Sequence, residues 1–370
     1  MFPYFLLLFI PTVCPLLFYQ TQRGVLVLGD DPISRKRNKM TILLFFVGLF
    51  VLLSLRDITV GKDLSEYKII FERCYRSSLD ELENFRWEMG YTIYNKLVAF
   101  LSKDYRFFLV ITALIVLIPI YKLYSKETKY SFLLIVLFIN MPCFLMIFSG
   151  LRQAIATSIG IFAFMALKKK KYILSALLIL LASWFHLSAW VLLLLYPAFF
   201  VKIKVNYLLF LLPAVIAIYV FRIPLLTALI TLMPDQYMDF YGEIENTGAI
   251  GMMILFLIFS IFAFVVLDET CISKETYFLR NILLIATVIQ FFVPIHGMVQ
   301  RMSYYFLIFV PVAILRIVQT PRKIMKNVSD TAVIVMSCFF SLYFFYSAAF
   351  STDNLLDVFP YKFYWSDNSW

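Results

Sequence analysis

Residues 148–171 read FSGLRQAIATSIGIFAFMALKKKK, one arginine ahead of an apolar run that ends in four lysines. The run 153–167 is close to the length that a helix needs to cross a bilayer, and lysines after it are typical of an anchor at the membrane surface. Similar apolar runs recur along the 370 residues, of which 62% are hydrophobic and 15% charged. A soluble domain this apolar could not cover its surface with polar groups. The composition therefore predicts an all-α, polytopic integral membrane protein.

About twelve transmembrane helices are expected from these runs, several of them short: 3–19, 40–55, 105–121, 131–148, 153–167, 172–185, 187–201, 206–221, 248–267, 280–295, 302–318 and 331–350. Two weaker amphipathic stretches, 89–103 and 223–241, are expected to lie at the interface or to re-enter the membrane. The first run has no basic n-region and no cleavage site, so it is expected to be a span and not a signal peptide. We expect one transmembrane domain over residues 1–370.

Basic residues indicate the orientation. The loops after the odd-numbered spans hold twenty of the 33 lysines and arginines, so these loops are predicted to face inward. The net charge of +10 then reflects membrane topology and does not predict a nucleic-acid partner. Both termini, the segments 56–104 and 222–247 and the tail 351–370 are expected outside. All five tryptophans fall at or beyond this outer boundary, where indole rings favour the headgroup layer: Trp87, Trp184, Trp190, Trp365 and Trp370.

Two arginines stand out on the expected outer face because the short outer loops carry almost no other charge. Arg152 and Arg301 each lie in the first turn of an inward-running helix, where the helix dipole disfavours a cation. No acid lies near Arg152 in the sequence. Such an arginine either holds an anionic ligand together with the helix N-terminus, or snorkels to lipid phosphate or pairs with a distant acid.

The two histidines, His186 and His296, also end helices on the expected outer face. Imidazole accepts a proton near neutral pH, so each is a candidate general base; the alternative is an interfacial histidine that caps a helix end. Two histidines without a nearby cysteine or acid pair do not make a zinc site, and five scattered cysteines predict no disulfide framework. We expect neither a metal nor a cofactor.

The first large outer segment contains further candidates. Gly61 permits a sharp turn, after which Asp63 can cap a helix and Glu66 can complete a capping box; this cap is enough to explain Asp63 without a catalytic role. Glu88 precedes a stretch that dips towards the bilayer, where a surface acid is the plain alternative to a general base. Arg56 ends an expected span, and a cation is favourable there.

These residues form a pattern that resembles the EpsG family of polysaccharide polymerases, which overlaps the Wzy-type O-antigen and capsule polymerases. The resemblance covers roughly residues 40–310. One departure is Lys62, where a small hydroxyl residue is commoner in relatives, and which affects the expected acceptor contacts. The matching motifs are Arg56…Val60-Gly61-x-Asp63-x3-Tyr67, Glu88-x-Gly90-Tyr91 before Asn95, Leu151-Arg152-Gln153-x-Ile155-Ala156 with the lysine run, Ala182-x3-His186-x-Ser188, and Arg301-x2-Tyr304-Tyr305.

The resemblance implies a metal-independent glycosyltransferase with a GT-C-like fold at the outer face of the bacterial inner membrane. It would transfer a growing glycan from undecaprenyl diphosphate to the sugar of a lipid-linked repeat unit, beside chain-length regulator and flippase proteins. Arg152 is then expected to have no protein partner, because its partner is the diphosphate. The implied catalytic candidates are His186, Asp63 and Glu88, and the implied diphosphate or substrate contacts are Arg56, Arg152, Gln153, Arg301, Tyr67 and Tyr304.

Three other functions remain open. A lipid-linked oligosaccharide flippase suits the number of helices, but the sequence shows no internal repeat and no matched pair of broken helices. A ligase that hands finished glycan to another acceptor shares the donor chemistry. An O-acyltransferase would need its histidine to meet a cytosolic acyl donor, whereas both histidines are expected outside.

Overall fold

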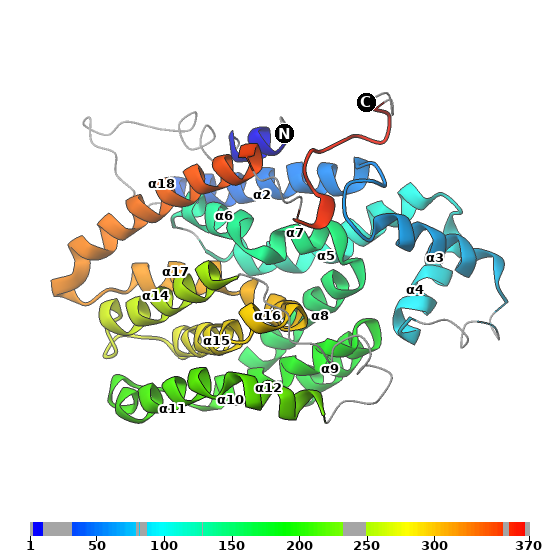
Figure 1. Cartoon of the computed structure of the whole chain (residues 1–370). Helices are drawn as coiled ribbons and strands as arrows, with labels where there is room; N and C mark the ends of the chain where they lie inside the picture. Colours follow the sequence, from blue (N-terminus) through cyan, green and yellow to red (C-terminus); the bar gives the residue numbers. More distant parts are fainter. Residues whose placement is uncertain are drawn as a thin grey trace. The chain divides into compact units, whose positions relative to one another are not determined.

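The computed structural model describes residues 3–9, 32–78, 81, 87–127, 129–231, 249–350 and 355–366. Throughout this part of the chain the regular structure is helical, apart from two isolated β-bridges, so the all-α prediction is confirmed. It divides into two compact units, residues 1–190 with 333–370, and residues 191–332 (Figure 1). The prediction of one transmembrane domain over residues 1–370 stays a prediction.

The helices follow the expected apolar runs. A helical stretch covers residues 3–9, and the rest of the first expected span lies outside the described residues. The first unit then holds α2 (Pro32–Leu55), α3 (Leu64–Arg76), α4 (Met89–Leu101), α5 (Tyr105–Tyr124), α6 (Ser131–Asn140), α7 (Pro142–Ser149), α8 (Leu151–Lys168), α9 (Tyr172–Phe185) and most of α18 (Lys326–Phe350). The second holds α10 (Leu195–Phe200), α11 (Leu208–Val220), α12 (Arg222–Ile230), α14 (Ile250–Val266), α15 (Lys274–Gln290), α16 (Gly297–Leu307) and α17 (Val310–Gln319), and the 3₁₀ helix η2 (Leu187–Leu194) joins the units in sequence.

Fewer of these helices have the length of a full span than the sequence suggested. Among the described residues, five are long and apolar enough to cross a membrane, or up to seven if each bent pair of helices is one span. The count of twelve spans and the GT-C resemblance therefore stay predictions.

Proline accounts for two sharp bends. The axes of α6 and α7 differ by 63° across Met141, whose backbone is extended ahead of Pro142, because a residue before proline avoids the helical region. The axes of α16 and α17 differ by 48° just before Pro311, which has no N–H to continue a helix. The sequence predicts no matched pair of broken helices, whereas the described residues contain one bent pair in each unit.

In the first unit α8 packs along α9 and α5, while α4 packs against α3 and α9 (Figure 1). The C-terminal segment, residues 355–366, lies against the loop between α2 and α3. There the Gly61 N–H donates to the Asp357 carbonyl (2.9 Å), and the Tyr364 N–H donates to the Leu55 carbonyl (3.0 Å). Residues of the C-terminal segment thus hold this loop in place.

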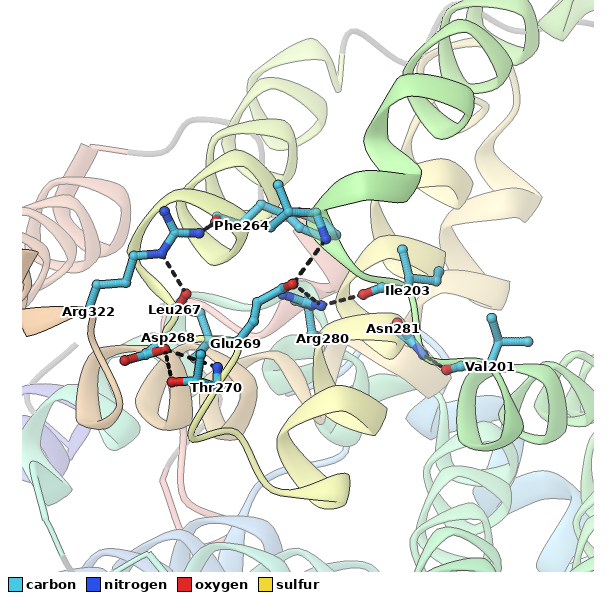
Figure 2. Close-up of polar contacts among 11 residues, drawn as sticks. Val201, Ile203, Phe264, Leu267, Asp268, Glu269, Thr270, Arg280, Asn281 and Arg322 are labelled. Carbon is cyan, nitrogen blue, oxygen red and sulfur yellow. Dashed lines mark hydrogen bonds and ion pairs between the residues drawn. The ribbon is translucent and has the colours of Figure 1, made fainter.

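In the second unit α15 packs against α10, α14, α16 and α17. Figure 2 shows the polar contacts of its first turns. The buried Arg280 donates to the Glu269 carboxylate (2.9 Å) and to the Ile203 carbonyl, and Arg322 donates to the Leu267 carbonyl (3.1 Å). These contacts join three loops that the sequence analysis assigns to the inner side of the membrane.

Candidate functional site

Arg152, the second residue of α8, has protein partners. Its guanidinium Nη1 donates to the carboxylate of Glu88, 64 residues earlier in the chain. The guanidinium carbon lies 3.7 Å from the centre of the Trp87 ring, and the charge of Arg152 acts on the nearby Tyr67 hydroxyl, whose pKa is raised by burial and lowered to a smaller extent by Arg152. The expectation that Arg152 lacks a protein partner is therefore wrong, and the alternative of a distant acid is confirmed.

Glu88, the N-cap residue of α4, accepts hydrogen bonds from three sides. Besides Arg152, its carboxylate is bonded to His186 Nδ1 (3.1 Å) and to the backbone N–H of Leu187 (3.2 Å). Burial raises the pKa of this carboxyl, but the hydrogen bond from His186 and the charge of Arg152 outweigh burial, and the pKa falls to about 2. Glu88 is therefore ionised at neutral pH and has no proton to donate.

The Glu88 contact also settles which nitrogen of His186 carries the proton. An ionised carboxylate only accepts hydrogen bonds, so Nδ1 is protonated and donates to Glu88. When the ring is neutral, its lone pair is then at Nε2. His186 follows α9 with an extended backbone, at φ −158° and ψ 118°. Its side chain thus contacts an acid and does not serve only as a helix cap.

Close packing between α4 and α9 brings Glu88 and His186 together. A Cβ atom on Gly90 would lie 2.7 Å from the Trp184 carbonyl oxygen and 2.9 Å from the Trp184 Cβ. Only glycine permits this approach without displacement of one helix. Trp184 itself is 55% exposed.

Asp63 also lies in the first unit. It is the N-cap residue of α3, but its side chain makes no capping hydrogen bond. The predicted capping role of its carboxylate is therefore wrong; its backbone N–H instead donates to Ser149 Oγ (3.3 Å). The carboxylate is half-buried and lies close enough to Tyr67 to contribute to the raised pKa of that hydroxyl, whose main cause is burial. Asp63 thus borders the site from the side of α3.

Arg56, directly after α2, is only 3% exposed. Its Nη1 donates to the Phe148 carbonyl (2.7 Å), and its guanidinium lies 5.5 Å from the centre of the Phe148 ring. Burial lowers the pKa of Arg56 to about 10, against the opposing effect of three nearby tyrosine hydroxyls. Arg56 therefore remains a cation at neutral pH, in contact with protein groups.

The other candidates are distributed over both units. Gln153 is buried in α8, beside Arg152 in sequence. Arg301 and Tyr304 lie on α16 in the second unit, the first exposed and the second buried. His296 caps the same helix, because its Nδ1 accepts from the Met298 N–H (3.1 Å). Within the first unit the structure brings together Glu88, Arg152 and His186, with Tyr67 and Asp63 near them. It does not relate the candidates of α16 to this group.

Trp87 is a site residue that the sequence analysis treated only as a boundary marker. The signal in the sequence was its position directly before Glu88, because neighbouring residues at the start of α4 lie at the same end of that helix. An arginine over an indole ring is held in place as well as attracted, by about 0.5–2 kcal/mol.

Comparison with known proteins agrees with the resemblance seen in the sequence. The model of the EpsG family matches residues 39–363, which include every candidate named above. No curated protein and no solved structure matched the chain.

Proposed function

The chain belongs to the EpsG family of polysaccharide polymerases, and from this we propose that it extends a glycan carried on undecaprenyl diphosphate. The growing glycan is the donor, and the acceptor is a sugar hydroxyl of an incoming lipid-linked repeat unit. The acceptor oxygen forms a bond to the anomeric carbon, the bond from that carbon to the diphosphate breaks, and undecaprenyl diphosphate leaves.

The observation that carries this proposal is the contact of one carboxylate, Glu88, with both Arg152 and His186. His186 Nε2 takes the proton of the acceptor hydroxyl, and Glu88 stabilises the imidazolium that forms. Before transfer the three side chains sum to zero charge; after proton transfer they carry one positive charge. That charge appears as the leaving diphosphate becomes more negative, so it favours the transition state over the bound substrate.

Arg152 contacts the diphosphate in this proposal. A guanidinium has five N–H donors in a fixed plane, and the Glu88 contact uses Nη1, so further donors can reach phosphate oxygens. Contacts from Gln153, Tyr67, Arg301 and Tyr304 are proposed on the resemblance. Asp63 is the alternative base, because its half-buried carboxylate borders the site from α3.

We place the site at the outer face of the bacterial inner membrane. Lys168 lies sixteen residues after Arg152 on the same helix, which corresponds to about 24 Å. This separation is comparable to the hydrocarbon core of a bilayer, so the lysine run and the site belong to opposite faces. Basic loops favour the inner side, which leaves the outer side for the site.

The test is single-turnover glycan transfer with purified lipid-linked substrates, comparing His186→Asn, Glu88→Gln and Asp63→Asn. Loss of the base lowers the rate by roughly 10²–10⁴-fold, and we expect this of His186→Asn. The matched control is Glu72→Gln, whose exposed carboxylate lies 3.9 Å from Lys68 on the surface of α3. If His186→Asn loses less than about tenfold while Asp63→Asn loses the full factor, Asp63 is the base.

The glycan profile of a strain without this chain separates the remaining functions. Single repeat units indicate a polymerase, and long chains left on the lipid carrier indicate a ligase. Lipid-linked repeat that accumulates on the inner leaflet indicates a flippase, which the bent helix pair found in each unit among the described residues favours.

A further inference from the structure

Three groups of the loop between α2 and α3 meet the last two residues of α7. Arg56 donates to the Phe148 carbonyl (2.7 Å), and the Asp63 N–H donates to Ser149 Oγ (3.3 Å). Gly61 adopts a φ of +119°, and a Cβ atom there would lie 2.4 Å from the same Phe148 oxygen. The loop thus contacts the end of α7 through the charged Arg56 side chain, a hydrogen bond from Asp63 and the close backbone approach of Gly61.

The junction between α7 and α8 sets the position of Arg152 at the start of α8. Only Gly150 separates α7 from α8, and Arg152 is the second residue of α8. A small change in the direction of α7 at Phe148 would therefore move the Arg152 guanidinium relative to Glu88 and Trp87. The C-terminal segment fixes the loop from its other side, through the backbone bonds of Gly61 and Leu55.

We propose that Arg56 is a positioning residue for glycan transfer, which holds the α7–α8 junction so that Arg152 meets Glu88, and that it does not touch the diphosphate. Its 3% exposure and its contact with the Phe148 carbonyl support this role. A cation at the carbonyl end of a helix is also favourable in itself. The effect on glycan transfer rests on the proposed function. The structural coupling between Arg56 and Arg152 does not depend on that function.

A double-variant cycle tests the inference, with Arg56→Gln, Arg152→Lys and both changes together. Effects of residues that act through one another do not multiply. We expect Arg56→Gln alone to slow single-turnover transfer by about 10–100-fold, and by less than about threefold in the Arg152→Lys background. Arg56→Lys should recover part of the rate, because its ammonium can still donate to one carbonyl. The control is Arg76→Gln, at an exposed arginine of α3.

Gly61→Ala approaches the same carbonyl from another residue and should reproduce the slow transfer of Arg56→Gln. Gly251→Ala is its matched control, because a Cβ atom at Gly251 meets nothing within 4 Å. Rate losses that multiply in the double variant, with unchanged thermal unfolding, would make Arg56 a direct ligand and overturn the inference. If the wild-type chain transferred no glycan, the proposed function would fail, and the Arg56–Arg152 coupling would still be measured from the unfolding free energies of the same four proteins.

Discussion

At the scale of single residues, the Glu88 carboxylate connects the charged groups of the candidate site. Arg152 and Glu88 are only 14% and 21% exposed in their side chains, so each would be a poorly solvated charge without the other. Removing one partner of such a pair costs about 3–5 kcal/mol when the pair is fully buried. Glu88 accepts from Arg152 at Oε2 and is hydrogen-bonded to His186 at Oε1, so one carboxylate links the arginine to the proposed base.

The acid stability of the protein should depend on Glu88. The folded pKa of about 2, against an ordinary 4.5, is worth at most about 3.5 kcal/mol of folding free energy. Because the folded pKa is depressed, this contribution is complete above about pH 4.5 and is lost as the pH falls towards 2. We expect the difference in unfolding free energy between wild type and Glu88→Gln to shrink over that range. A difference that stays constant between pH 7 and 3 would contradict the assignment.

Arg152→Lys should lose most of the transfer activity although the charge is kept. An ammonium is a point charge and cannot lie flat on Trp87 while it donates both to Glu88 and to the phosphate oxygens of the proposed substrate. The measurement is glycan chain length in cells, at equal amounts of membrane-inserted protein, with Arg76→Lys as control. Near-normal chains would return Arg152 to a purely structural role.

At the scale of helices, apolar periodicity predicts where a helix lies but not where it bends or which helix it meets. The expected span 105–121 became α5, whereas 131–148 became α6 and α7 with a break at Met141. Pro142 was visible in the sequence, yet a proline in a membrane helix does not fix the bend angle. Glu88 and Arg152 were both candidates, but their pairing was not predictable, because no local pattern relates residues 64 positions apart.

Gly90→Ala tests the packing of α4 on α9. The added methyl group would lie 2.7 Å from the Trp184 carbonyl, and overpacking of this kind costs about 1–3 kcal/mol. We expect a lower unfolding temperature and slower transfer, since α4 carries Glu88 away from His186 as it moves. Gly251→Ala again serves as the control, and equal behaviour of the two variants would mean that the helices separate without cost.

At the scale of the whole molecule, composition and charge were the most informative features of the sequence. The apolar composition predicted an all-helical membrane protein, and the motifs predicted the EpsG family, which the match over residues 39–363 shows. Orientation rests on twenty basic residues in the loops after odd-numbered spans. No motif in the sequence relates Arg152, in the first unit, to Arg301, in the second.

Topology is tested with single cysteines in a background without the native ones. Lys170→Cys, in the run after α8, should resist impermeant thiol reagents in intact spheroplasts, because positive loops stay inside. Arg76→Cys, in the outer segment 56–104, should react and serves as the positive control. Labelling at 170 would reverse the orientation and with it the outer location of the site.

The contact of the C-terminal segment with the loop after α2 has a consequence for biosynthesis. The Tyr361 hydroxyl donates to the Leu52 carbonyl (2.8 Å), and 309 residues separate the two. At about 5–20 residues per second a ribosome takes roughly 15–60 s to add them. During that interval the early helices are already in the membrane while the loop beside Arg56 still lacks its second support. A nascent chain is therefore expected to remain inactive until translation has passed residue 366, which would keep incomplete copies from consuming lipid-linked sugar.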